Sequence, residues 1–410
     1  MSQLSTHRSF WRHLLRAFPV FVTVTLITLA LEYAGWLRGF ETTTLDTWLR
    51  LAKPIKPQFV CIVTINEDDY LHIFGGKSPL DPKIVMTLIS AIADGKPAVS
   101  GVDIDTSDAQ WRGIVPELQP LSQGRTVIVW EQEATGQEEP LTRVNVLGGA
   151  ETRPKPLSGI SGLFQDWDGV VRRSRRYFST AGGREGQIEI VDSFPWAIVK
   201  AFAQRFPKAS RLPYGLRQAL QGETHGDRKL QRERFLNFSG SRYDFPTYSA
   251  AFVLTAHEAE WWKDKSPLRG KVVLLGGSYR AGRDVYMTPL GTTSGVQLMA
   301  QVVESELQGR GISELNRLLM VLFDFAAWIA LVAVYYFCRL SVALCMSIVA
   351  IPLASLAGSL FAFSSFAYWM DFAPVILGVV IHQLYDHAQA YRRLLKESQR
   401  GSATGASRVD

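Results

Sequence analysis

Long apolar runs at both ends of the chain constrain its fold more than any other feature. A helix of ~20 apolar residues, rising ~1.5 Å per residue, crosses the ~30 Å hydrocarbon core of a bilayer. One such run precedes the central part of the sequence and three follow it, at residues 18–37, 318–337, 340–363 and 369–387. The last run is the weakest, because it is short and its end carries histidines and an aspartate. The sequence therefore predicts an α-helical membrane bundle of four transmembrane helices.

Two other interpretations of these runs stay open at this level. The basic start before the first run also fits a cleaved signal peptide, although the run is long for one and no small-x-small site follows it cleanly. The later runs could be buried helices of a large soluble protein, although three in succession are rare in soluble cores. Asp324 in the second span is a candidate for a polar contact inside the bundle. It lies near the outer end of the span, so we favour contact with the interface.

Lysine and arginine residues near the spans predict the orientation of the bundle. Such residues gather on the cytoplasmic side of membrane helices. Here they fall on one side only if there are four spans: Arg8, Arg12, Arg16, Arg339, Arg392, Arg393, Lys396 and Arg400. Residues 1–17 are then a cytoplasmic N-terminus, and residues 388–410 a short cytoplasmic tail, low in hydrophobic residues, that we expect to be disordered. Residues 38–316 form a large domain on the outer side.

Short β-branched runs alternate with helical patterns in this outer domain. Asp81 is a suitable N-cap and Pro82 a suitable first residue for one of the helices. Strand, helix and strand at this spacing favour an α/β fold with a mixed or mostly parallel sheet. We expect strands at 59–66, 98–104, 126–132, 235–240 and 271–278, helices at 81–95, 193–206, 249–262 and 295–307, a loop or insertion at 133–156, and no clear element at 207–233.

Charge and cysteine usage exclude few classes of function. The net charge of +6 could indicate a nucleic-acid partner. No basic helical face interleaved with aromatic residues is present, however, and much of the basic excess lies at the two chain ends, so no nucleic acid is expected. The three cysteines, Cys61, Cys338 and Cys345, neither prove nor exclude an oxidising compartment.

Motifs of known catalytic or metal sites are missing from the sequence. The stretch GGSYR at 276–280 lacks the closing glycine of a nucleophile elbow, and HEAEW at 257–261 lacks the second histidine of a zinc-protease helix. The histidines of the outer domain are widely separated, at His72, His225 and His257. We therefore expect no metal, no cofactor and no enzymatic activity.

Acidic and basic side chains at strand ends are the candidate binding residues. Asp103 and Asp105 end a strand, where α/β proteins place their ligand crevices. Glycines lie at the end of the strand at 271–278, without the lysine and hydroxyl residue of a phosphate loop. A backbone anion nest beside Arg280 or Arg283 is the remaining option there.

The stretch DWDGVVRR at 166–173 has the composition of a turn that leads into a strand. Aspartates separated by one residue are common in turns, because the carboxylate accepts backbone hydrogen bonds. We therefore favour a structural role for Asp166 and Asp168, and a binding role stays open.

Three of these stretches, in this order, resemble the CHASE2 domain, an extracytoplasmic sensory module of bacterial membrane receptors. They are VDID, then DWDGVVRR, then KVVLLGGSYRAGRDVYMTPLG followed by SGVQLMAQVVESEL. That family has one helix before the domain and three after it, and the resemblance covers residues 40–387. The most specific matches are D-x-D-G-V-V-R at Asp166, Asp168, Gly169, Val170, Val171 and Arg172, and D-x-x-x-T-P-L-G at Asp284, Thr288, Pro289, Leu290 and Gly291.

The chain departs from the family pattern in several places. An acid and a histidine of the family are replaced by Gln297 and Met299, and Asn66 stands where an aspartate is common. Family members typically continue into a kinase or cyclase, whereas only the tail 388–410 follows the last predicted span here, so we expect a protein without its own output domain. The resulting ligand-binding candidates are Asp103, Asp105, Asp168, Arg172, Arg280 and Asp284.

The resemblance implies a non-enzymatic sensor in the bacterial inner membrane. Its periplasmic domain would detect an unknown ligand or protein and relay the signal to a separate output protein, with a continuous helical connection at 295–337 as the lever. The basic tail is either a docking surface or, as we favour, a positive-inside anchor. A structural or assembly subunit of an envelope complex is the alternative function. An enzymatic function would require turnover at a cluster of polar residues, Asp103, Asp105, Asp168 and Arg172. The protein could also form a homodimer.

Overall fold

The protein divides into two compact units in the computed structural model. The helical unit comprises Met1–Trp48 and Ser313–Asp410, and the α/β unit comprises Leu49–Ile312. The residues that the structure describes are 2–51, 56–116, 126–136, 139–149, 155–181, 188–206, 213, 216–217, 220, 233–238, 244–338, 342–343, 346–370, 376–381 and 383.

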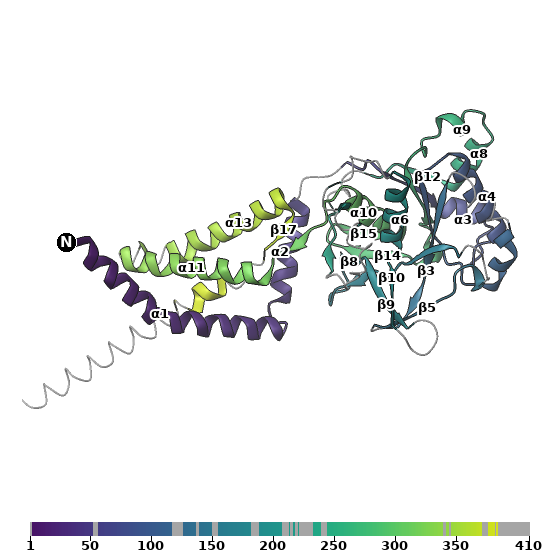
Figure 1. Ribbon diagram of the computed structural model, residues 1–410. Helices are drawn as coiled ribbons and strands as arrows, with labels where there is room; N and C mark the ends of the chain where they lie inside the picture. The colour runs from purple at the N-terminus through teal and green to yellow at the C-terminus, as the bar shows by residue number, and fades with distance from the viewer. Residues whose placement is uncertain are drawn as a thin grey trace, which may run out of the picture. The chain divides into compact units, whose positions relative to one another are not determined.

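A six-stranded parallel sheet forms the centre of the α/β unit (Figure 1). Its order is β12-β1-β13-β2-β3-β6, so the strand that comes last in sequence, β13, lies between β1 and β2. The predicted parallel α/β fold is therefore confirmed for this unit. The strands are β1 (Val60–Ile65), β2 (Val99–Asp103), β3 (Val127–Gln132), β6 (Leu157–Ile160), β12 (Thr247–Ser249) and β13 (Val272–Gly277).

Helices cover both faces of this sheet, because successive strand residues point to opposite sides. Val63 and Ile65 of β1 pack with α4 (Pro82–Asp94) and α8 (Ala250–His257) in one core. Val60 and Ile62 pack with α6 (Phe194–Arg205) and α10 (Gly295–Leu307) in the other. Asp81, Ser193 and Ser249 cap the N-termini of α4, α6 and α8 through their side chains, as is typical of these residue types.

Smaller sheets lie in stretches where the sequence predicted loops or longer elements. The predicted loop at 133–156 contains β4 (Ala134–Thr135) and β5 (Leu141–Arg143), which join β9 (Tyr177–Ala181) and β10 (Ile188–Asp192). The strand predicted at 235–240 is only the two-residue β11 (Arg234–Phe235). The helix predicted at 249–262 ends at His257, and a short α9 (Trp262–Lys265) follows. Most of 207–233 lies outside the described residues.

The other elements of the α/β unit are short and connect the larger ones. They include the two-stranded sheet of β14 and β15 that follows β13. Their bounds are α3 (Glu67–His72), η1 (Ala109–Ile114), η2 (Leu147–Gly149), β7 (Phe164–Gln165), β8 (Val171–Ser174), η5 (Arg280–Gly282), β14 (Val285–Thr288) and β15 (Gly291–Ser294).

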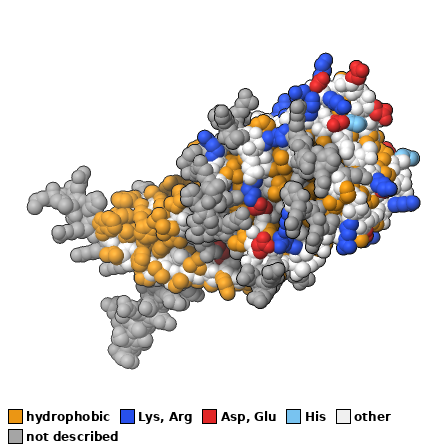
Figure 2. Space-filling model, turned by 45° about the vertical axis from the view of Figure 1, so that its right-hand side comes forward, with side chains coloured by type: hydrophobic (Ala, Val, Ile, Leu, Met, Phe, Trp, Pro, Cys, Tyr) orange, Lys and Arg blue, Asp and Glu red, His pale blue; other side chains and the backbone are white. Residues whose placement is uncertain are grey.

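The helical unit contains two described helices that are long and apolar enough to cross a membrane. They are Leu318–Phe337, within α11 (Arg317–Phe337), and Met346–Phe366, which joins the π-helical η6 (Met346–Ala350) to α13 (Ile351–Phe366). A third span results if Phe18–Tyr33 of α1 (Ser2–Tyr33) and α2 (Arg38–Leu51), which meet at an 83° bend, are counted together. Figure 2 shows hydrophobic side chains gathered over the helices of this unit.

The four-helix bundle predicted from the sequence therefore stays a prediction. The first predicted span, 18–37, is interrupted in the structure, since α1 ends at Tyr33 and Gly35 has a φ of +75°. The fourth predicted span, 369–387, begins in the two-residue β17 (Tyr368–Trp369), which pairs with β16 (Ser313–Glu314). Most of its remaining length lies outside the described residues, which include a helical stretch at 376–381.

The connection over 295–337, expected to act as a continuous lever, is interrupted between its two predicted helices. Helix α10 ends at Leu307, and Gly309 follows with a φ of +64°, a left-handed conformation that terminates helices. Helix α11 starts anew after Asn316, whose side chain accepts a hydrogen bond from the amide of Leu318 at 3.0 Å. Any mechanical link along this stretch has to pass through the non-helical segment between the two helices.

Candidate functional site

The carboxyl ends of the central strands carry a cluster of acidic side chains. Asp103 is the last residue of β2, and Glu131 lies near the end of β3. The strands are parallel neighbours in register, with Val102 opposite Trp130, so their carboxyl ends meet at one edge of the sheet. This edge is where open α/β sheets place their ligands.

These acids line a crevice of about 490 Å³. The carboxyl groups come from the ends of β2 and β3 and from the loop before β14, and two tyrosines and an arginine complete the polar wall. The residues concerned are Asp103, Asp105, Glu131, Glu133, Asp284, Tyr279, Tyr286 and Arg283. The crevice therefore combines a dense group of carboxyl side chains with aromatic rings.

Glycine at position 295 lets α10 approach the crevice closely. A Cβ atom there would lie 2.2 Å from Oδ2 of Asp284, a distance that no substitution tolerates without movement. The amide of Gly295 instead donates to the backbone carbonyl of Asp284 at 3.0 Å. The first turns of α10, through Gly295 and Met299, thus form part of the crevice wall.

Burial and mutual repulsion raise the pKa values of the crevice carboxyls. Desolvation raises the pKa of Glu131 to about 7, and its acidic neighbours add to the shift, although the Ser161 hydroxyl donates to Oε1 of Glu131 at 2.5 Å. The pKa of Asp103 is raised well above its usual value by burial and then by Glu131 and Asp284. Burial also raises the pKa of Asp284. The crevice consequently binds protons near neutral pH.

Three of the six residues predicted from the sequence meet in this crevice, namely Asp103, Asp105 and Asp284. The carboxylate of Asp105 also accepts from the amide of Ser107 at 2.8 Å, as in an Asx turn. Arg280 does not line the crevice, and its amide donates to Oε2 of Glu67 at 2.8 Å, so this amide is already used. The arginine that does line the crevice is Arg283.

The other two predicted residues, Asp168 and Arg172, pair with each other outside the crevice. The guanidinium of Arg172, 2% exposed, donates to both oxygens of Asp168 at 2.8 and 2.7 Å and to Asp166 at 3.0 Å. The hydrogen bonds from Arg172 hold the pKa of Asp168 below its usual value. This turn lies beside β14, since Val170 forms a bridge with Met287. The geometry is that of a turn held to its strand.

Sequence reasoning missed Glu131, Glu133 and Tyr286. The two glutamates follow the same rule that identified Asp103, because they lie at the end of a predicted parallel strand, in TVIVWEQE. Tyr286 carried no comparable signal in the sequence. It comes into the crevice through the β14–β15 pair, and its hydroxyl interacts with Asp284, which with burial raises the pKa of Tyr286.

No group of three or more His, Cys, Asp or Glu side chains is arranged to hold a metal ion within the residues that the structure describes. The crevice acids come from separate loops and strand ends, and they affect each other mainly through charge.

The far end of α10 holds the chain segment that enters β1. Both carboxylate oxygens of Glu304, 5% exposed, accept hydrogen bonds from three successive amides, those of Gln58 at 2.8 Å, Phe59 at 3.0 Å and Val60 at 2.8 Å. This segment follows α2 in the chain.

Glu306, the penultimate residue of α10, forms a buried ion pair. Its Oε2 lies 2.6 Å from Nη2 of Arg176 and 3.5 Å from Nη1 of Arg234. Burial alone would raise the pKa of Glu306, but these two arginines outweigh it and the net shift is downward. The last turns of α10 are thus fixed by charge to three other parts of the α/β unit.

Comparison with known proteins gives one positive result. No curated protein and no solved structure matches the chain. The model of the CHASE2 domain matches residues 22–339, which is more than half of the sequence and includes the crevice, α10, α11 and the last part of α1. The chain therefore belongs to the CHASE2 domain family, a family of extracytoplasmic sensor domains.

Proposed function

We propose that this protein is a non-enzymatic sensor of the bacterial inner membrane. In this proposal the α/β unit lies in the periplasm, binds its ligand in the acidic crevice, and passes a change of state along α10 towards the membrane helices. The observation that carries the proposal is the position of α10: Gly295 and Met299 line the crevice, and Glu304 holds the segment that follows the first membrane helices.

The chemistry of the crevice favours a ligand that carries positive charge or hydrogen-bond donors. Carboxyl groups whose pKa values are raised keep protons that a cationic ligand displaces. The unliganded crevice is then partly protonated, and the liganded crevice is ionised and neutralised by the ligand. A ligand shifts the balance between two states when it binds one of them more tightly.

Helix α10 is suited to transmit such a difference. Its 13 residues span ~20 Å, and nearly all of them are buried in the core shared with α6 and the sheet. A displacement of its first turn is therefore passed on as a displacement of a rigid body. At the other end of α10, Glu304 accepts a hydrogen bond from the segment that enters β1, and Glu306 pairs with Arg176. A displacement of α10 therefore alters both contacts.

Hydrogen exchange in the full-length protein in nanodiscs tests this transmission. The variant Glu131→Gln reproduces the neutral side chain of protonated Glu131, and Asp108→Asn, an exposed N-cap residue of η1, is the control. We expect Glu131→Gln to alter the exchange of the amides of Gln58, Phe59 and Val60 by about fivefold and Asp108→Asn to leave it unchanged. A change confined to β2, β3 and their loops would contradict the proposal.

The output of the sensor is, in this proposal, a separate protein in the membrane or the cytoplasm. Photo-crosslinking from positions in the segment 396–410, followed by mass spectrometry, tests this. Capture of a kinase, cyclase or other signalling protein is the expected result. Reproducible capture of a large envelope complex without any signalling enzyme would instead establish the assembly-subunit alternative.

A further inference from the structure

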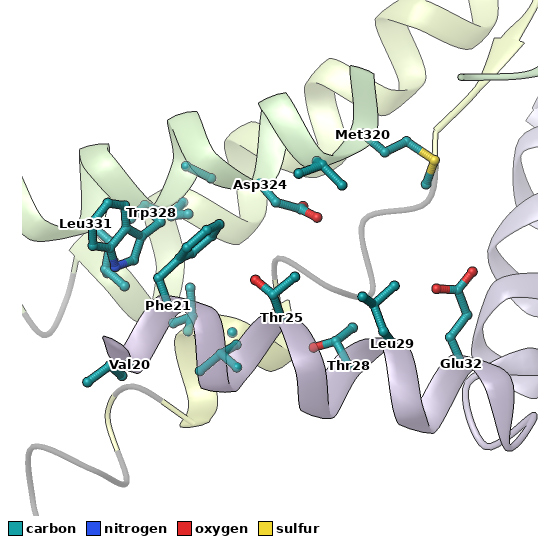
Figure 3. Close-up of a pocket in the computed structure, with 16 residues that line it drawn as sticks. Val20, Phe21, Thr25, Thr28, Leu29, Glu32, Met320, Asp324, Trp328 and Leu331 are labelled. Carbon is teal, nitrogen blue, oxygen red and sulfur yellow. The ribbon is translucent and has the colours of Figure 1, made fainter. Parts of the chain in front are cut away.

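A second cavity lies within the helical unit, between the helices that flank the α/β unit in sequence. It has a volume of about 140 Å³ and is formed mainly by α1 and α11, with Ile351 of α13 and the neighbouring residues Gly378 and Val379 (Figure 3). This cavity shares no lining residue with the acidic crevice of the α/β unit.

The two ends of this cavity differ in polarity. One end is apolar and aromatic, with Phe21, Trp328 and Leu331. At the other end Thr25 and Glu32 of α1 point towards α11, and the carboxylate of Asp324 on α11 points back towards α1 (Figure 3). The acidic residue that the sequence placed near the membrane interface therefore faces a cavity between helices.

The hydroxyl of Thr28 is a buried polar group that has no partner in the described part of the chain. Thr28 lines the cavity, is 4% exposed, and its Oγ1 makes no hydrogen bond. Thr23 on the same helix shows the usual alternative, because its hydroxyl donates to the carbonyl of Pro19 at 2.9 Å. An unsatisfied hydroxyl in an apolar setting destabilises the protein, because the group has lost its hydrogen bonds to water. The side chain of Thr28 thus points to a missing hydrogen-bonding partner.

The size of the cavity limits the partner to a small group. A transmembrane helix is ~10 Å wide and does not fit. A cavity of ~150 Å³ lined by apolar side chains accepts an apolar group the size of benzene. The apolar end can therefore take a short length of alkyl chain. The polar end offers two carboxyl groups and a hydroxyl that can accept hydrogen bonds, which matches a cationic head with several N–H donors.

We propose that this cavity binds the ammonium head and the first methylenes of an amphiphilic amine. The head lies between Glu32, Asp324 and the Thr28 hydroxyl, and the chain lies against Phe21 and Trp328. The same head occurs on a free long-chain amine and on the lipid phosphatidylethanolamine, and the experiment below separates these two sources.

Photolabelling of the full-length protein tests this site. The probe is dodecylamine with a diazirine in its chain, and the protein is held in nanodiscs of phosphatidylcholine. We expect saturable labelling that maps to α1 and α11, and competition about tenfold stronger by dodecylamine than by dodecanol, which has the same chain and a neutral head. Labelling that does not saturate, or equal competition by the two compounds, would overturn the proposal.

Substitutions at Thr28 provide a matched pair of variants. Thr28→Val removes the hydroxyl without changing the volume, so it should weaken probe binding by about tenfold while leaving the protein as stable as before or more so. Thr28→Ser keeps the hydroxyl and should keep the affinity. Unchanged probe binding by Thr28→Val would overturn the proposal. The thermal stability of this variant, measured in parallel, shows whether it folds.

Charge variants test the head group. Glu32→Gln and Asp324→Asn should each weaken binding of the dodecylamine probe, and Asp46→Asn, on α2 and outside the cavity, should not. Equal effects of all three variants would argue against the site. Adding phosphatidylethanolamine to the nanodiscs then identifies the source: suppressed labelling shows that the bilayer supplies the amine, and unchanged labelling shows that a free amine does.

Discussion

Asp168 and Arg172 show how the most recognisable motif of the chain acts at the level of single residues. Arg172 is almost fully buried and therefore needs its carboxylate partners, since an unpaired buried charge is strongly destabilising. Asp168 supplies both of its oxygens and Asp166 supplies one. The motif thus stabilises a turn and does not contribute side chains to the crevice.

Substitution of Asp168 tests this structural role. Asp168→Asn removes the charge that partners Arg172, while Asp166 remains, so the free energy of unfolding of the α/β unit should fall by about 1–3 kcal/mol. Trp167→Ala changes the neighbouring side chain, which is 65% exposed, and should leave stability within about 0.5 kcal/mol. Thermal denaturation of the full-length protein measures both. Equal stability of Asp168→Asn and wild type would contradict a structural role.

Glu131 makes stability depend on pH in an unusual direction. Its pKa is about 7 in the folded protein, above the value of ~4.3 expected for an unfolded chain. Between these values the folded state binds more protons, so stability decreases as pH rises. The melting temperature of wild type should therefore fall between about pH 5 and pH 8.

The variant Glu131→Gln removes this titration and should flatten the pH dependence. At pH 8 it should exceed wild type in stability by on the order of 1–3 kcal/mol, and near pH 5 the two should converge. Melting curves across this range check the prediction. Equal pH dependence of stability in wild type and Glu131→Gln between pH 5 and pH 8 would contradict the raised pKa of Glu131.

Part of the crevice could be predicted from the sequence, because some of its acidic residues lie at the ends of predicted strands. Asp103 and Asp105 follow a buried strand, and parallel strands bring such positions to one edge. Which of the remaining acids join them depends on loops. Asp284 reaches the crevice through the path of the loop before β14, and Asp168 is taken away from it by Arg172. No local pattern in the sequence records these two outcomes.

At the scale of elements, α10 is the structure that connects the crevice with the entering chain. Its periodic apolar residues predicted a helix at 295–307, and the structure has the same bounds. The predicted end of this helix agrees with the break after Leu307, and Gly309 and Asn316 are typical of a helix end and a helix start. The strand order was not predictable, because β13 enters the sheet between two strands that precede it by more than 150 residues.

Glu304→Ala tests the attachment of α10 to the entering chain. The substitution leaves the amides of Gln58, Phe59 and Val60 without their charged acceptor, so the α/β unit should lose about 2–3 kcal/mol of stability. Glu260→Ala, at an exposed position, is the control and should change stability by less than about 0.5 kcal/mol. Hydrogen exchange should locate the loss at 58–60. Unaltered protection of these amides would show that the bonds carry little energy.

At the scale of the whole molecule, an α/β sensor unit is joined in sequence to apolar helices on both sides. Large hydrophobic side chains such as Leu26, Phe323 and Phe361 are exposed on the helical unit, as is expected of a surface that faces lipid. In the proposed topology the bilayer covers these apolar side chains, whereas water surrounds the α/β unit. Hydropathy revealed this division readily, whereas the bend between α1 and α2 depends on Gly35 and on contacts that hydropathy does not record.

Accessibility of an introduced cysteine tests the orientation. Lys263→Cys lies at an exposed position of α9 in the α/β unit, and Cys338 and Cys345 are replaced by serine. A membrane-impermeant maleimide should label it in cells whose outer membrane alone has been permeabilised. Labelling only after the inner membrane has been opened would place this unit in the cytoplasm and reject the proposed topology.

The central claim is that the crevice and the membrane helices are coupled through α10, and the reactivity of Cys338 at the end of α11 tests it most directly. Cys61 does not interfere, because it is 2% exposed and burial raises its pKa to about 12, and Cys345 is replaced by serine. In nanodiscs, Glu131→Gln should change the alkylation rate of Cys338 by about twofold or more, and adding Glu304→Gln should remove this difference. Identical rates in wild type and Glu131→Gln, or a difference that survives Glu304→Gln, would contradict the account.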